Sequence, residues 1–253
     1  MADIMKRFFQ ILIVLMVSAA TAGAVMTGLS YAHEGSWRKA NRSSVGIAPD
    51  PAKVSEAIVQ VYAARAWSWR GAFGVHTWIA VKPTDALEFT VYEVIGWRAR
   101  RGLSVLSISN RPADGRWFGN APEILADIRG SGIDEVIGRI DQVAKTYPYN
   151  NEYRVWPGPN SNTFTAYVAR QIPELRLDLP PTAVGKDYLD GSGFADSSPS
   201  GTGYQVSLYG LAGLLVGREE GFEINLLGLT FGIDPADIAL KLPMIGTIGP
   251  KLD

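Results

Sequence analysis

The 253-residue chain contains no cysteine, and this absence excludes several kinds of chemistry. Disulfide bridges, zinc–thiolate sites, iron–sulfur clusters and thiol nucleophiles all require that residue. Any covalent chemistry of this protein must therefore use an oxygen or a nitrogen atom.

Histidine is nearly as scarce, because the chain has only His33 and His76. His33 follows a long hydrophobic run at the N-terminus, so the two imidazoles do not form the cluster that a histidine metal site needs. We predict no metal and no cofactor. His76 is the one imidazole available inside the globular part of the chain.

Charge of one sign is also not in excess, since 24 basic and 25 acidic residues give a net charge of -1. Nucleic-acid binders need a basic surplus to neutralise phosphates, so nucleic acid is not a predicted partner. With 47% hydrophobic and 19% charged residues, the composition is that of a globular domain. We predict a single domain over residues 52–253, preceded by a linker at 33–51.

The N-terminal segment 1–32 contains an uncharged run from Phe8 to Ala32, which is long enough to span a bilayer as one hydrophobic helix. The run also ends in Ser30-Tyr31-Ala32, the small-residue pattern of a signal-peptide cleavage site. A retained anchor and a cleaved signal both remain open. Either one predicts a membrane contact through this segment and a domain on the periplasmic side of the inner membrane, or secreted from the cell.

Strand-like and helix-like patterns alternate in the first part of the domain. Residues 58–62, 75–82 and 88–97 are rich in β-branched and aromatic side chains, and the last two runs predict a hairpin around Asp85. Residues 121–129 and 132–146 have helical spacing. The fold class predicted from these patterns is α+β, with a small antiparallel sheet packed on helices.

The second part begins with cap residues at Asn160 and Ser161, which predict a helix through Gln171. Residues 182–202 are dense in Gly, Ser and Asp and predict a flexible surface loop. Residues 204–216 and 222–233 are apolar runs around a turn, and together they predict a C-terminal hairpin over 204–233. Such a hairpin either completes the sheet or contacts lipid.

Three residues form the predicted catalytic site: His76 on the first hairpin strand, Glu93 on the second, and Ser161 at the helix start. A carboxylate across the hairpin would orient the imidazole, and a helix N-terminus favours developing negative charge at a serine. Each residue also has a structural interpretation: a hydrogen-bonded core histidine, a helix cap, and a glutamate paired with a nearby arginine.

Longer motifs carry a family resemblance. GVHTWIAVK, YEVIGW, RWFGN, YPYNNEYRVWPGPNSNTFTAYVA and LLVGREEGFEINLLGLTFGID resemble the bacterial domain-of-unknown-function family 3750 over nearly the whole chain after residue 45. The order of the elements, with a histidine strand before an Asn-X-Asn helix start, is similar to circularly permuted papain-like proteins of the NlpC and lecithin:retinol-acyltransferase types. In those proteins a cysteine stands at the place of Ser161.

The second resemblance implies a permuted papain-like hydrolase or acyltransferase that acts on an amide or ester of the envelope, in a peptidoglycan peptide or a lipid. Ser161 would be the nucleophile, His76 the base and Glu93 the residue that orients the base. Asn160 and Asn162 would donate to an oxyanion, and four tryptophans would line the substrate cleft: Trp78, Trp97, Trp117 and Trp156. The competing hypothesis is a non-catalytic envelope module that binds a partner, glycan or lipid, or that assists membrane assembly.

Overall fold

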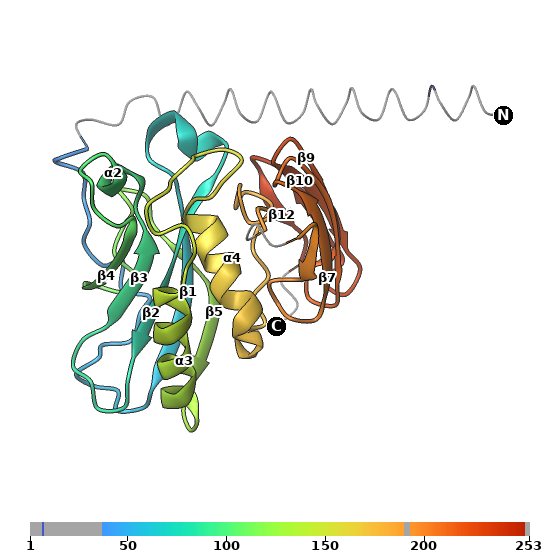
Figure 1. The fold of residues 1–253 in the computed structure, drawn as a ribbon. Coiled ribbons are helices and arrows are strands. Elements are labelled where there is room, and N and C mark those ends of the chain that lie inside the picture. Colours follow the sequence, from blue (N-terminus) through green and yellow to red (C-terminus); the bar gives the residue numbers. More distant parts are fainter. Residues whose placement is uncertain (1–6, 8–36, 190–192, 251–253) are drawn as a thin grey trace.

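The computed structural model describes residue 7, residues 37–189 and residues 193–250 (Figure 1). Strands dominate over helices within these ranges. In chain order the elements are β1 (Ile58–Arg65), η1 (Ser68–Ala72), β2 (Val75–Lys82), β3 (Thr90–Val94), α2 (Gly96–Ala99), β4 (Leu106–Asn110), β5 (Glu123–Arg129), α3 (Ile133–Lys145), α4 (Ser161–Gln171), η2 (Pro173–Leu175), β6 (Ala195–Ser197), β7 (Gly203–Leu208), β8 (Ala212–Gly217), β9 (Gly221–Leu226), β10 (Leu229–Asp234), β11 (Ala239–Leu242) and β12 (Gly246–Ile248).

The first sheet has five antiparallel strands in the order β4-β3-β2-β1-β5. One face carries side chains such as Ile79 and Val81, which pack with residues of α3 and α4, including Ile140 and Phe164. Figure 1 shows both helices on this side of the sheet. The opposite face forms a second apolar cluster around Trp78. Because both faces are covered, all eight residues of β2 are buried.

The second sheet has seven antiparallel strands in the order β12-β11-β10-β9-β8-β7-β6. Each strand pairs with its neighbour in the sequence, so the sheet is a simple meander. In Figure 1 it stands beside α4, on the side of the helix away from the first sheet. One face of the second sheet therefore looks toward the rest of the protein and the other looks away from it.

Two predicted elements are wrong in type or number. Residues 123–129 form strand β5, which pairs with β1, whereas their spacing predicts a helix. The free edge of β1 decides this, because a strand that completes a sheet satisfies more backbone groups than a short isolated helix. The predicted hairpin over 204–233 is four strands, β7 to β10, since tight turns at Gly210 and Gly228 break each apolar run in two.

The remaining expectations concern the fold class, the linker, the loop and the N-terminus. The α+β expectation holds in its coarser form, with antiparallel sheets and few helices, but the protein is mostly β and has two sheets. Residues 43–48 of the predicted linker lie against the domain, where Asp114 accepts hydrogen bonds from the Ile47 and Ala48 amides. In the predicted loop 182–202, residues 185–187 are buried. The predicted N-terminal helix lies outside the described residues, and none of the described helices meets the length and hydropathy needed to cross a membrane.

Candidate functional site

His76 and Glu93 are in direct contact on the face of the first sheet that looks away from α3 and α4. His76 Nε2 lies 2.9 Å from Glu93 Oε2. The pairing of Ile79 with Tyr92 places Glu93 opposite Trp78, two residues along from His76, so the contact is diagonal across the strands. The predicted proximity of the two residues is confirmed.

Arg111 completes this group, because its Nε donates to Glu93 Oε1 at 3.2 Å. Its guanidinium also lies 4.9 Å from the centre of the Trp78 ring. Arg111 is not among the site residues predicted from the sequence. It lies just beyond β4, and only the turn after that strand returns its side chain to the hairpin, so no local pattern indicated it.

Aromatic rings enclose the imidazole. The Trp117 ring stacks on His76 with centroids 3.5 Å apart, and Trp97 stacks in turn on Trp117 at 5.7 Å. Trp78 lies 5.8 Å from the imidazole and donates its indole N–H to the Ala113 carbonyl. Two of the four predicted cleft tryptophans, Trp78 and Trp117, therefore lie against His76, and Trp97 lies one ring further out. The rings fill the space around the histidine, which is only 4% exposed.

The protonation of the pair follows from this burial. Removal from water lowers the pKa of His76, although the bond to Glu93 opposes the shift. Burial by itself would raise the pKa of Glu93, but the hydrogen bond from His76 and the charge of Arg111 outweigh it and hold that pKa below its usual value. An ionised carboxylate only accepts, so the neutral imidazole donates through Nε2.

Ser161 begins α4, and the asparagines on either side of it make structural hydrogen bonds. The Asn160 side chain accepts hydrogen bonds from the backbone N–H groups of Asn162 and Thr163. The Asn162 amide donates to the Val75 and Val184 carbonyls at 3.1 Å and 2.8 Å. Neither asparagine amide points an unused donor at Ser161, which is itself 3% exposed.

The residue of β2 that faces the helix start is Thr77. Its hydroxyl contacts the Ser161 carbonyl, the Asn162 side chain and the Thr165 hydroxyl at 2.8–3.4 Å. Adjacent residues of a strand point to opposite faces. His76 therefore lies on the far face of the sheet from Ser161, and the predicted triad is not assembled in this structure.

Trp156 is the predicted cleft residue that lies apart from the others. Its ring is 52% exposed, and its indole N–H donates to the Leu227 carbonyl in the turn between β9 and β10. It therefore joins the loop before α4 to the second sheet and lines no cleft around His76.

A small pocket lies elsewhere, with a volume of about 180 Å³. Its lining includes four tyrosines and Arg170, and the buried Tyr147 hydroxyl has no hydrogen-bond partner among the described residues. Arg170 donates to the Ser197 and Lys186 carbonyls and to Gln205. The four tyrosines that line the pocket are Tyr147, Tyr149, Tyr167 and Tyr188. None of the predicted site residues lines it.

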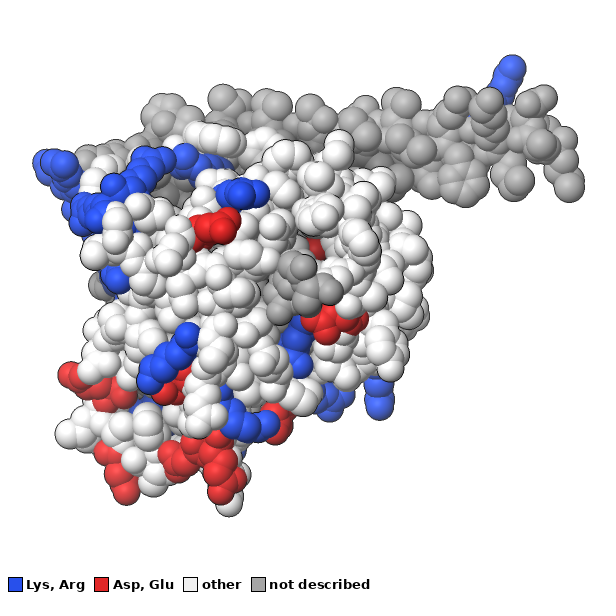
Figure 2. Space-filling view, in the orientation of Figure 1, with Lys and Arg blue, Asp and Glu red and all other residues white. Residues whose placement is uncertain are grey.

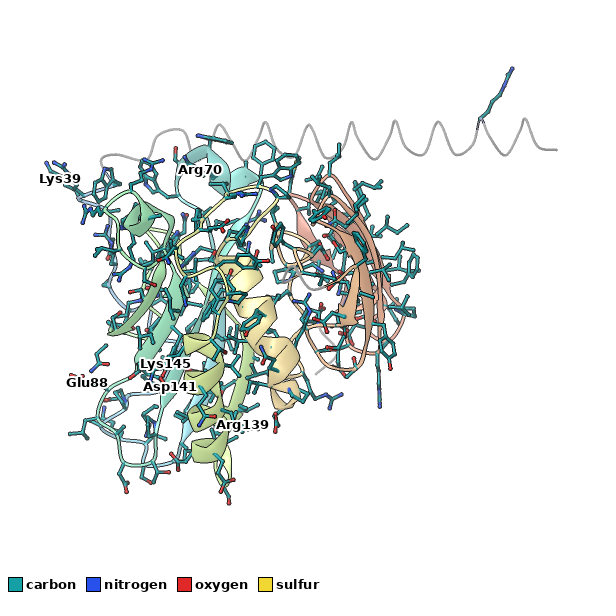
Figure 3. The ribbon with its side chains drawn as sticks, viewed as in Figure 1. Lys39, Arg70, Glu88, Arg139, Asp141 and Lys145 are labelled. Atoms are coloured by element: carbon teal, nitrogen blue, oxygen red, sulfur yellow. The ribbon has the colours of Figure 1, made fainter. Side chains whose placement is uncertain are left out.

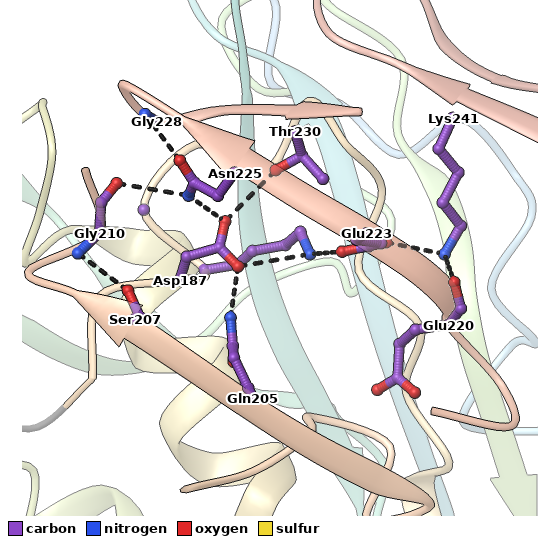
Figure 4. Close-up of polar contacts among 12 residues, drawn as sticks. Asp187, Gln205, Ser207, Gly210, Glu220, Glu223, Asn225, Gly228, Thr230 and Lys241 are labelled. Atoms are coloured by element: carbon purple, nitrogen blue, oxygen red, sulfur yellow. Dashed lines mark hydrogen bonds and ion pairs between the residues drawn. The ribbon is translucent and has the colours of Figure 1, made fainter. Parts of the chain in front are cut away.

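The inner face of the second sheet holds a buried polar network (Figure 4). Glu223 on β9 pairs with Lys186 and, at 2.9 Å, with Lys241 on β11. Asp187 accepts from Gln205, from Asn225 at 2.6 Å and from Thr230 at 3.3 Å. Burial disfavours the Lys186 ammonium, but the charges of Asp187 and Glu223 outweigh it and keep its pKa above the usual value. The network attaches residues 186–187 to the sheet.

The outward side chains of β7 to β12 in the second sheet are all apolar, and on the edge strand β6 the polar Ser197 lies on the same face, beside Tyr204. Strand pairing puts Ile248, Leu240, Ile233, Phe222, Val216 and Tyr204 in one row, and side chains of the same kind fill the rows beside it. We call this surface the outer face. Its members are Tyr204, Val206, Leu208, Ala212, Leu214, Val216, Phe222, Ile224, Leu226, Leu229, Phe231, Ile233, Leu240, Leu242 and Ile248.

Most of these side chains are open to solvent, with Tyr204 81% exposed, Leu226 56% and Ile233 53%. Large contiguous apolar patches of this kind mark interaction surfaces in soluble domains.

Among the described residues, no group of three or more metal-binding side chains is present.

Comparisons with known proteins identify the part of the chain that holds the histidine group and the start of α4. No curated protein and no solved structure matches the chain. Residues 56–188, slightly more than half of the chain, match the family model described as protein of unknown function (DUF3750). The matched part includes the first sheet and its helices and stops before β6, so the chain belongs to the DUF3750 family and the second sheet lies beyond the matched residues.

Proposed function

We propose that this protein is a non-catalytic module of the cell envelope, attached to the membrane by residues 8–32, that assembles through the outer face of its second sheet. The observation that carries the proposal is the composition of that face, in which every outward position of β7 to β12 is apolar. An antiparallel sheet with one face in water normally places its polar residues outward. Here the polar residues point inward, so the outer face is expected to be covered when the protein works.

The hydrolase or acyltransferase hypothesis has less support. A serine hydrolase needs a base within hydrogen-bond reach of its nucleophile. Thr77 is the β2 residue that faces Ser161, while His76 is held on the other face by Glu93 and Trp117. The permuted papain-like fold remains a resemblance in the order of motifs.

A second copy of the chain is the occupant that fits the outer face best. Seven strands about 4.8 Å apart, with about five residues each rising about 3.3 Å, give a footprint of roughly 550 Å². A standard protein interface buries about 800 Å² on each partner, and homodimer interfaces are the more apolar ones. Two outer faces packed together would form a β-sandwich with an apolar interior.

Symmetry agrees with attachment to a membrane. If the two-fold axis of the dimer lies in the interface and runs parallel to the strands, corresponding ends of the two subunits lie on the same side of the dimer. The segments that precede Trp37 in the two copies then enter the same membrane. The outer face also offers almost no hydrogen-bonding side chain beyond the Tyr204 hydroxyl, as expected for a sandwich core.

Cross-linking provides the test, because the natural chain has no cysteine. Ile224 lies on β9, the middle strand of the sheet, and Ile124 lies on β5 of the other sheet with the same 36% exposure. Full-length Ile224→Cys in membranes should give a dimer band with a short bis-maleimide, and Ile124→Cys should not. Equal bands, or none from Ile224→Cys, would overturn the proposal.

The location is tested separately. A reporter fused after residue 253 should be active only outside the cytoplasm, because the run from Phe8 to Ala32 has the length of an export signal or anchor. A cytoplasmic reporter signal would remove the envelope from the proposal while leaving the dimer intact.

A further inference from the structure

Basic side chains cluster at one end of the molecule, whereas acidic and basic side chains are mixed at the other end. Basic side chains gather at the upper left of Figure 2, and acidic ones gather at the lower end. In Figure 3, Lys39 and Arg70 lie at the first end, whereas Glu88, Asp141 and Arg139 lie toward the other. The net charge of -1 hides this polarity completely.

Three segments form the basic end: residues 37–42 (WRKANR), 69–73 (WRGAF) and 97–103 (WRARRGL). Each begins with Trp-Arg, and none contains an acidic residue. The three tryptophans, Trp37, Trp69 and Trp97, are 42%, 57% and 40% exposed. The seven basic residues are Arg38, Lys39, Arg42, Arg70, Arg98, Arg100 and Arg101.

Ring contacts hold these segments together. The Arg42 guanidinium lies 4.3 Å from the centre of the Phe118 ring, and Trp97 packs against the same ring at 5.4 Å. Trp67, directly before η1, lies 6.5 Å from Phe118. Phe118 is therefore the common support of parts that are far apart in the sequence.

From this arrangement we infer that the basic end binds the headgroup layer of an anionic lipid bilayer. Exposed tryptophans beside arginines are the side chains that favour the boundary between lipid and water, and anionic headgroups attract clustered basic residues. The chain supplies an independent indication, because the uncharged run from Phe8 to Ala32 ends five residues before Trp37. The inference does not rest on the proposed function, and it applies to either side of the membrane.

A protein partner fits this end less well. The arginines of the basic end are spread over three segments, whereas an anionic bilayer presents charge over its whole surface. Glu88 and Asp141 lie toward the opposite end, so this orientation also keeps these carboxylates away from the anionic surface.

The test uses full-length protein in vesicles and an environment-sensitive fluorophore on a single introduced cysteine. Leu103 lies in the basic end and is 49% exposed, and Leu87 lies beside Glu88 and is 71% exposed. Labelled Leu103→Cys should brighten and shift to the blue in vesicles that contain phosphatidylglycerol, but not in pure phosphatidylcholine. Labelled Leu87→Cys should respond to neither. The Leu103→Cys response should also fade at about 1 M salt, where the Debye length is about 3 Å.

Charge reversal then tests the electrostatic part. Arg100→Glu with Arg101→Glu should weaken the contact by about 30-fold or more, as expected if each lost basic residue costs about fivefold. Arg139→Glu with Lys145→Glu, on α3 at the other end, should leave it unchanged.

Flotation with the vesicles checks in each case that the N-terminal segment is still inserted. A Leu103→Cys signal that ignores phosphatidylglycerol, or equal signals from the two labelled positions, would overturn the inference. The cross-linking of the outer face would be unaffected by either outcome.

Discussion

The two sheets of this protein use the same strand periodicity in opposite ways. β1 and β2 are buried on both faces, and the packing there is mainly apolar, with a few buried polar side chains such as Gln60, His76 and Thr77. In the second sheet the inner face is polar, with Glu223 and Asn225 buried, and the outer face is apolar and exposed. The buried face of a sheet is therefore not always its apolar face. The second sheet is attached to the protein through its polar face, by charged side chains, and its apolar face is free to contact another surface.

The largest expected effect tests whether charges hold the second sheet. Lys186→Met removes one of the two cations from Glu223 in a fully buried site, which should lower the free energy of unfolding by about 3–5 kcal/mol. Urea unfolding of the two proteins measures the difference. Lys53→Met, in an exposed pair with Asp50, is the control and should change stability by less than about 0.5 kcal/mol. Similar losses of unfolding free energy in both variants would mean that the buried network stabilises the protein no more than an exposed ion pair does.

A second test compares the same substitution at one isoleucine in each sheet. Ile79 is fully buried on the helix-facing side of the first sheet, so Ile79→Ala should cost about 3 kcal/mol. Ile233 on the outer face is 53% exposed, and Ile233→Ala should cost less than about 0.5 kcal/mol in the monomer. Thermal unfolding of dilute protein gives both values. A large loss for Ile233→Ala would indicate that the outer face is already covered within one chain.

The start of α4 provides a smaller effect that separates capping from catalysis. The Asn160 side chain makes five hydrogen bonds, three as acceptor from the first turn of the helix and two as donor to Val155 and Val184. Asn160→Ala should therefore lower the free energy of unfolding by about 2 kcal/mol. Ser161→Ala, one residue later, should leave stability unchanged within about 0.5 kcal/mol, and a loss as large as that of Asn160→Ala would show that Ser161 is itself a structural residue.

The smallest expected effect concerns pH. Burial lowers the pKa of His76 below its ordinary 6.5, so the unfolded chain takes up a proton before the folded protein does as the pH falls. The contribution of His76 to stability is therefore present above pH 6.5 and is lost as the pH falls through the folded pKa. Urea unfolding between pH 7.5 and 5.5 should show a shallower decline in His76→Gln than in the natural protein. A steeper decline in the variant would mean that Glu93 holds the imidazole charged.

Local patterns predicted correctly those elements whose stability is local. The helix expected at 132–146 is α3 at Ile133–Lys145, since one apolar stripe determines which face is buried. The hairpin around Asp85 and the contact between His76 and Glu93 follow from pairing between strands that are close in the sequence. The helix start at Ser161 follows from the cap residues before it.

The position of Ser161 relative to His76 could not be predicted in this way. It depends on which face of β2 receives α4, and a shift of one residue along a strand exchanges the two faces. The spacing between the motifs is the same whether His76 or Thr77 meets the helix. Strand β5 was missed for a related reason, because only the unpaired edge of β1 favours a strand over the helix that the spacing indicates.

The sequence by itself determined the absence of thiol chemistry, the long hydrophobic run before the domain, the main helix and hairpin, and the apolar runs after residue 203, in which apolar and polar residues alternate over 204–208 and 222–226. These properties depend on composition or on neighbours a few residues apart. Only the tertiary structure decided that the polar side of that alternation faces inward, because Lys186 and Asp187 bring charges that a sheet of apolar residues could not accept. The alternation along a strand shows which residues share a face but not which face is buried. The partner against which the sheet packs determines that.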